Sequence, residues 1–173
     1  MKLSSRIKKD SFTLIELLVV ITIIGILSAI VLANYRGGEE QYALQRSAHQ
    51  LAQDIRKAEE MAMASKEFNG EIPQGGYGIS VVENSNSYIL FADVDNLYSY
   101  DSGEEVGSPL ELEKKVKICG VSPSSPLIIT FTPPDPTIFL SGGSEAKITL
   151  CLETDSSKTK IISVNKAGLI EIK

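Results

Sequence analysis

A single carboxylate, Glu16, lies near the start of an apolar run that extends from Phe12 to Ala33. No charged side chain follows it between Leu17 and Ala33. About 20 helical residues, at ~1.5 Å each, cross the ~30 Å hydrocarbon layer of a bilayer. A carboxylate buried there is costly when it has no partner. The run therefore predicts a membrane helix in which Glu16 either lies at the headgroup level, where it costs little, or has a fixed partner.

The second stretch with candidate chemistry is the acidic segment 93–105. Four carboxylates fall at the first, third, ninth and twelfth places of a calcium-loop frame: Asp93, Asp95, Asp101 and Glu104. Leu97 and Tyr98 stand where an EF-hand needs a ligand and a glycine, so that frame fails. Other oxygen geometries bind Ca²⁺, and the four residues are therefore a weak candidate Ca²⁺ site. The simpler interpretation is a solvated acidic loop, and no other cofactor is expected.

Cys119 and Cys151 are the only cysteines. Each is out of phase with its apolar neighbours in a predicted strand, so both point off the same type of face. A disulfide would close a loop of about 32 residues and contribute about 3–4 kcal/mol. Two reduced thiols are the alternative, if the cell does not oxidise exported proteins. The solitary His49 has no ligand-spaced partner and is interpreted as a surface histidine.

The residues before the apolar run are basic: Lys2, Arg6, Lys8 and Lys9, with one Asp10. Positive charge on this flank predicts that the N-terminus stays in the cytoplasm and that the chain beyond Ala33 is exported. A secretory signal peptide would have a shorter apolar core and a small-residue cleavage site. Because residues 33–36 continue a helical pattern instead, a retained membrane helix is favoured.

A second helical pattern occupies residues 39–67, after a polar break at 34–38 whose two glycines could loosen the helix. Its apolar stripe has spacings of four and three: Leu44, Ala48, Leu51, Ile55, Ala58 and Ala62. Phe68-Asn69-Gly70 is predicted to end it, with Gly70 as the left-handed cap. A helix continuous from Phe12 to Lys66 would place its first part in lipid and pack its second part along a sheet.

From Glu71 onwards the apolar period becomes two and turn residues become frequent. The predicted strands are Tyr77–Val82, Ser87–Ala92, Lys114–Cys119, Leu127–Thr132, Thr137–Leu140, Ala146–Leu152, Lys160–Val164 and Leu169–Ile172. Glu83–Asn86 is a predicted hairpin turn. The expected fold is α+β: a long N-terminal helix packed on an antiparallel β-sheet or β-sandwich. The expected parts are a basic leader (1–11), a membrane and assembly helix (12–33), its amphipathic continuation (34–68) and an exported β-rich head (69–173).

The stretch from Ser11 to Ala29, S|FTLIELLVVITIIGILSA, resembles the prepilin amino-terminal motif of type IV pilins and type II secretion pseudopilins. In that family a membrane aspartyl peptidase removes the leader before a Phe, and the new N-terminus is methylated. A Glu at the fifth mature position pairs with the terminal charge of a neighbouring subunit. The resemblance implies cleavage between Ser11 and Phe12, N-methylation of Phe12, and an assembly role for Glu16.

Two departures from the family pattern are informative. Ser11 stands where the family usually has Gly. Because Ser is also small, we expect processing to survive at a lower rate. Ala33 stands where many major pilins have Pro, which favours a minor pilin or pseudopilin. The strand-rich C-terminal part, ending in SVNKAGLIEI, resembles the pseudopilin H and minor-pilin class more weakly.

Two classes of function follow. The first is a structural subunit of a type IV pilus or type II secretion pseudopilus. The resemblance gives it, as partners, prepilin peptidase, other pilins or pseudopilins, an inner-membrane assembly platform with a separate ATPase, and membrane lipid. Such filaments serve secretion, adhesion, motility or DNA uptake. The second is a membrane-tethered extracytoplasmic binding module or enzyme that uses the helix only as an anchor.

Composition argues against two other classes. From Phe12 onwards, 13 Lys and Arg stand against 21 Asp and Glu, a net charge of −8. A broad nucleic-acid-binding surface is therefore not expected. One His, no nucleophile elbow and no Gly-rich phosphate loop argue against an enzyme.

Overall fold

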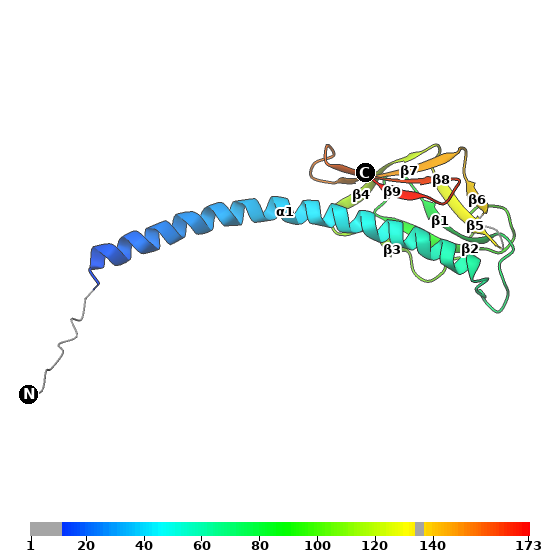
Figure 1. Ribbon diagram of the computed structural model, residues 1–173, viewed down its shortest axis with the longest axis horizontal. Helices are drawn as coiled ribbons and strands as arrows, with labels where there is room; N and C mark the ends of the chain where they lie inside the picture. The colour runs from blue at the N-terminus through cyan, green and yellow to red at the C-terminus, as the bar shows by residue number, and fades with distance from the viewer. Residues whose placement is uncertain (1–11, 134–136) are drawn as a thin grey trace, which may run out of the picture. The chain divides into compact units, whose positions relative to one another are not determined.

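The computed structural model describes residues 12–133 and 137–173, in which one helix is followed by nine strands (Figure 1). The elements are α1 (Leu14–Met63), β1 (Gly76–Val81), β2 (Ser87–Asp93), β3 (Leu110–Glu111), β4 (Val116–Ser122), β5 (Leu127–Thr132), β6 (Thr137–Leu140), β7 (Glu145–Leu152), β8 (Thr159–Asn165) and β9 (Ile170–Ile172). The predicted α+β class is confirmed. Every predicted strand is present to within a few residues, and only the two-residue β3 was missed. The predicted leader, 1–11, lies outside the described residues.

The chain divides into two compact units, with the boundary between Glu39 and Glu40. The described part of the first unit, residues 12–39, is almost entirely helix. The second unit, residues 40–173, contains the rest of α1 and all the strands. The boundaries predicted after residues 33 and 68 stay predictions.

The backbone of α1 is helical throughout residues 34–38, where the sequence predicted a loosening. A glycine inside a helix costs only about 1 kcal/mol relative to alanine. Two such residues do not outweigh the hydrogen-bonded turns on both sides.

The helix ends at Met63, seven residues before the predicted cap at Gly70. Ser65 adopts the left-handed conformation (φ 46°), and the Lys66 amide donates to the Met61 carbonyl at 3.1 Å. The Ser65 amide also donates to the Ala62 carbonyl, which completes a Schellman motif. The predicted cap was therefore wrong: Asn69 and Gly70, both with positive φ, form a separate tight turn in which Phe68 and Glu71 exchange backbone hydrogen bonds.

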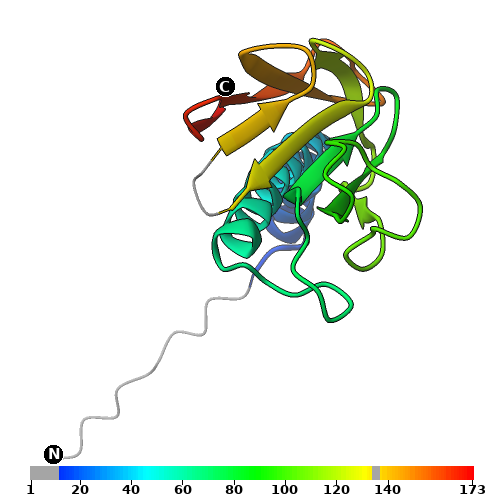
Figure 2. The same ribbon diagram turned by 90° about the vertical axis from the view of Figure 1, so that its right-hand side faces the viewer.

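The strands form two antiparallel sheets, ordered β3-β2-β1-β5-β6 and β4-β7-β8-β9. The predicted hairpin at Glu83–Asn86 joins β1 to β2, with Val81 opposite Tyr88. In Figures 1 and 2, the C-terminal part of α1 runs alongside the strands within the second unit. All six residues of the predicted helical stripe are buried there.

The core forms between this stripe and the inner faces of the sheets. Its strand residues include Tyr77, Ile79, Leu90, Ile129, Phe131, Ile148, Leu150 and Ile162. Two hydrogen bonds fix the helix to the first sheet. The Tyr88 hydroxyl donates to Asp54 Oδ2 at 2.6 Å, and the Tyr77 hydroxyl donates to the Lys66 carbonyl at 2.7 Å.

Candidate functional site

Glu16, the residue with a predicted role in assembly, lies at the start of α1. Thr13 immediately precedes the helix, and Glu16 lies in its first turn. The Glu16 amide donates to Thr13 Oγ1 at 3.3 Å, while Glu16 Oε2 lies 3.5 Å from both the amide nitrogen and the hydroxyl of Thr13. This is a capping box, in which each side chain satisfies the other residue's backbone amide.

The capping box gives Glu16 local partners before any second chain is present. A carboxylate in the first turn also lies at the positive end of the helix dipole. The sequence interpretation considered a headgroup-level position or a partner on a neighbouring subunit for Glu16, and it missed Thr13. The Thr-x-x-Glu spacing before an apolar run was the signal that could have identified it.

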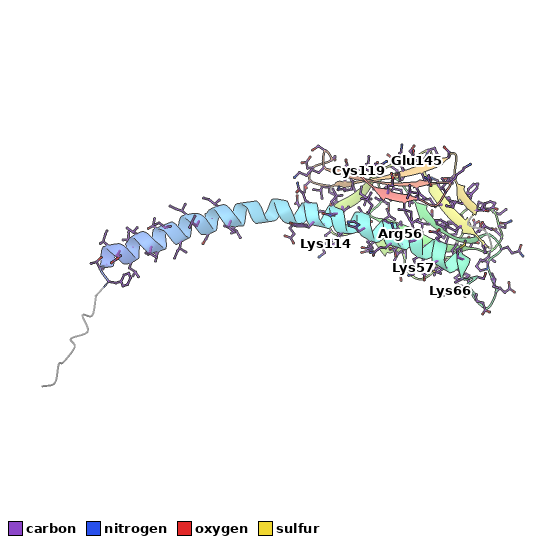
Figure 3. The ribbon with its side chains drawn as sticks, in the orientation of Figure 1. Arg56, Lys57, Lys66, Lys114, Cys119 and Glu145 are labelled. Carbon is purple, nitrogen blue, oxygen red and sulfur yellow. A yellow bond between two sulfur atoms is a disulfide. The ribbon has the colours of Figure 1, made fainter. Side chains whose placement is uncertain are left out.

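The helix beyond Glu16 exposes its apolar side chains. Residues 14–32 are long and apolar enough to cross a membrane, and all of them are exposed within this chain. Figure 3 draws these side chains radiating from the helix. The hydroxyl of Thr22 donates to the Leu18 carbonyl at 2.8 Å, so this polar group is satisfied inside its own helix. Nineteen residues extend about 28 Å, close to the hydrocarbon thickness.

Phe12 and Thr13 precede the first helical residue, and 79% of Phe12 is exposed. A peptidase acting just before Phe12 therefore meets the new terminal residue outside the helix. Ser11, the other residue of the predicted cleavage site, lies outside the described residues.

The acidic segment brings together three of its four predicted carboxylates. Oxygens of Asp93, Asp95 and Glu104 lie within 4.8 Å of one another. Asp93 is completely buried, Glu104 is 7% exposed, and Asp95 is exposed. Asp101 is not part of this group; its backbone amide donates to Glu104 Oε2 at 3.0 Å, and its carbonyl accepts from the Glu104 amide at 3.2 Å. Whether a cation occupies the group stays a prediction.

Backbone amides hold the two buried carboxylates. Asp93 accepts hydrogen bonds from the amides of Leu97 and Tyr98, at 3.2 and 3.0 Å. Glu104 Oε1 accepts from the Val94 amide at 2.9 Å. Burial raises the pKa of Asp93, the Tyr98 and Leu97 amides lower it, and the Glu104 charge raises it further.

The loop that follows Asp93 covers the outer face of the first sheet. The Tyr98 ring stacks on Phe139 of β6, with ring centroids 4.6 Å apart, and Tyr100 packs edge-on against Phe91 of β2. The Tyr100 hydroxyl donates to Glu105, and this bond lowers the pKa of that carboxyl. Asp93 therefore anchors a loop whose aromatic side chains close the outer layer.

Cys119 and Cys151 are joined in a disulfide between β4 and β7, with their Cα atoms 5.8 Å apart. The strand register shifts between Ile118 and Gly120, which places Cys119 at a β-bulge. Cys151 stays outside the core cluster that contains Ile148, so both sulfurs lie on the outer face of the second sheet. Cys119 is labelled in Figure 3.

Comparison with known proteins bears on the amino-terminal segment alone. Residues 6–32 match the family described as the prokaryotic N-terminal methylation motif. No curated protein and no solved structure matches the chain. The match includes Ser11, Phe12, Thr13 and Glu16. The chain therefore carries, at its amino terminus, the N-terminal methylation motif of the type IV pilin and pseudopilin family.

Proposed function

We propose that the chain is a structural subunit, a minor pilin or pseudopilin, of a type IV pilus or type II secretion pseudopilus. The observation that carries the proposal is the coincidence of three features in residues 6–32. These are the methylation motif, an apolar helix with every described side chain exposed, and a single carboxylate at the capped start of that helix. A membrane anchor alone requires only the second feature.

The proposed topology follows from charge and length. The basic residues before Ser11 hold the N-terminus in the cytoplasm, residues 14–32 cross the inner membrane, and the unit 40–173 lies outside the cytoplasm. Prepilin peptidase then removes residues 1–11, and the new amino group of Phe12 is methylated. Cleavage at this bond does not require unwinding of α1, because Phe12 and Thr13 are not helical.

Assembly is the proposed role of Glu16. Its carboxylate lies 3.5 Å from the Thr13 amide nitrogen, one residue from the amino group that cleavage creates at Phe12. A neighbouring subunit can present the same kind of ammonium to Glu16. Pairing two charges at this depth offsets the desolvation of both. Partner subunits pack on the exposed apolar face of residues 14–32, which has the length for the membrane but no cover within this chain.

The processing step is tested by expressing the full chain with and without a prepilin peptidase and recording its intact mass. We expect the loss of residues 1–11 and the gain of one methyl group when the peptidase is present. An uncut chain, or a cut at another bond, contradicts the proposal.

The assembly step is tested with Glu16→Ala, using Glu39→Ala as the matched control because Glu39 is an exposed carboxylate on the same helix. We expect Glu16→Ala to remain in the membrane fraction but to be lost from sheared filaments, while Glu39→Ala assembles normally. If both variants behave like the parent chain, the helix is only an anchor and the tethered-module function replaces the filament.

A further inference from the structure

A groove of about 330 Å³ lies where α1 ends, between the loop 68–73 and the loop 94–104. Its lining residues are Phe68, Asn69, Glu71, Pro73, Val94, Ser102, Gly103 and Glu104. We name it the loop groove. It lies wholly inside the second unit, and none of its lining residues belongs to residues 6–32, which carry the methylation motif.

The lining of the loop groove combines apolar walls with carboxylates. Phe68, Pro73 and Val94 supply the apolar part, and Glu71 and Glu104 supply negative charge. None of the described residues that line it is Lys or Arg. Lys66, labelled in Figure 3 near the end of α1, is close in sequence but does not line the groove.

Two further carboxylates, those of Asp93 and Asp95, lie close to Glu104 and add to the negative charge near the groove. Glu104 is nearly buried, and its carboxylate lies within 4.8 Å of those of Asp93 and Asp95. No ion pair in the described part of the chain joins a Lys or Arg to any of these three carboxylates. Repulsion between Asp93 and Glu104 is therefore relieved only by backbone amides, and a cation entering the groove would relieve it further.

Apolar surface continues outside the groove. Ile72 is 53% exposed and Leu97 is 65% exposed, and each belongs to one of the two loops that form the walls. A small cation would satisfy the carboxylates but would leave the apolar walls and these two side chains in water. A polypeptide that places a basic side chain between apolar ones uses both features.

We propose that the loop groove is a docking site for a partner polypeptide that inserts an arginine side chain flanked by apolar residues. The groove volume is at the small end of the range for ligand pockets, which fits one side chain better than a larger ligand. Arginine fits better than lysine because its planar guanidinium donates to two acceptors at once and keeps its charge when desolvated. This role does not rest on the proposed filament function, because none of the residues that line the groove belongs to α1.

The test uses the full chain in lipid nanodiscs and a fluorescent Leu-Arg-Phe peptide, with Leu-citrulline-Phe as the matched neutral probe. Fluorescence anisotropy should give a Kd for the arginine peptide at least tenfold lower than for the citrulline peptide. Raising the salt concentration from 50 to 500 mM should weaken the arginine peptide alone, roughly as expected for a screened charge pair.

The variant Glu71→Gln should weaken binding of the arginine peptide at least fivefold, because it removes a groove charge without disturbing the buried hydrogen bonds of Glu104. The control is Glu171→Gln on β9, an exposed carboxylate that pairs with Lys173 and does not line the groove. It should leave the Kd unchanged.

Three results overturn the proposal: no binding of the arginine peptide at 1 mM, equal affinity for the citrulline peptide, or equal effects of the two glutamine variants. Calorimetry with Ca²⁺, first on the chain alone and then with the arginine peptide bound, provides the fourth. Stoichiometric Ca²⁺ binding that displaces the peptide would make the groove a cation site and remove the docking role.

Discussion

At the residue scale, Asp93 shows how a carboxylate can be buried without a counter-ion. It is the last residue of β2, and the Cβ that any other residue would add at Gly75 would lie 2.1 Å from its Oδ2. Only glycine therefore fits at position 75. The amides of Leu97 and Tyr98 stabilise the carboxylate, yet burial still raises its pKa. Asp93 therefore holds the following loop in place, although burial of its charge is unfavourable.

That cost predicts a pH dependence. Because the folded-state pKa of Asp93 lies above its unfolded value of about 3.8, the folded chain holds this proton more tightly. Its contribution to stability is therefore greatest at acid pH and is lost as the pH rises through the folded pKa. The difference in unfolding free energy between Asp93→Asn and the parent chain should therefore shift in favour of the variant as the pH rises from 4 to 7. Urea denaturation at each pH measures this difference.

Asp155→Asn is the control of opposite sign. Hydrogen bonds from the Ser157 hydroxyl and amide lower the pKa of Asp155, so its contribution is present at neutral pH and is lost as the pH falls. This variant should lose relative stability as the pH rises towards the unfolded pKa of about 3.8, and it should change little between pH 4 and 7. Parallel pH profiles for the two variants would contradict the assignment.

A second residue-scale prediction concerns Thr130 on β5. Its side chain is completely buried, and Thr130 Oγ1 is the buried side-chain polar atom without a hydrogen-bond partner among the described residues. Thr130→Val keeps the shape and removes the unsatisfied hydroxyl. We expect the unfolding free energy to rise by about 1 kcal/mol. Thr137→Val on β6, where the side chain is exposed, should change it by less than about 0.5 kcal/mol.

At the scale of elements, a partly buried hydrogen bond between Tyr88 and Asp54 couples α1 to β2. Burial raises the pKa of Tyr88, and its bond to the Asp54 carboxylate raises it further, so the hydroxyl stays a donor. Tyr88→Phe would leave Asp54 without this donor and should lower the unfolding free energy by about 1–3 kcal/mol. The exposed Tyr42→Phe on the same helix is the matched control, and equal losses would rule out the coupling.

Local patterns predicted most elements because each depends on neighbours in sequence. The stripe from Leu44 to Ala62 has helical spacing, and the strand at Leu127–Thr132 was predicted with its observed ends. The end of α1 was not predicted. A serine at position 65 takes the left-handed conformation, whereas Asn69-Gly70, the stronger sequence signal, belongs to a turn. Local propensity ranked the two sites in the wrong order. It does not include the hydrogen bond that the Tyr77 hydroxyl, on β1, donates to the Lys66 carbonyl just after the observed end of the helix.

At the scale of the whole molecule, the second unit should fold without the first. The sheets and residues 43–62 of α1 share one core, and residues 12–39 lie in a separate unit. We expect the fragment 40–173 to unfold cooperatively on heating, measured by near-UV and far-UV circular dichroism, and to remain soluble without detergent. A fragment with far-UV but no near-UV signal would show that the core needs the rest of the helix.

The disulfide constrains the same unit. Cys119 and Cys151 are 32 positions apart, and the chain-entropy estimate for such a loop is about 3–4 kcal/mol. The unfolding free energy of the double variant Cys119→Ala/Cys151→Ala should therefore be lower by about that amount, with a lower denaturant midpoint. The parent chain treated with reductant should match it, and an unchanged midpoint would contradict a stabilising bridge.

The sequence alone determined the features that depend on local order. These are the apolar helix with Glu16 at its start, the amphipathic continuation, the run of short strands, and the amino-terminal motif. Only the tertiary structure decided which distant residues meet. It divided the strands between two sheets, placed Glu104 but not Asp101 beside Asp93, and left Thr130 buried without a partner. The physical reason is that periodicity encodes which face of an element is buried, whereas the contacts of a loop depend on the packing of strands that are distant in the chain.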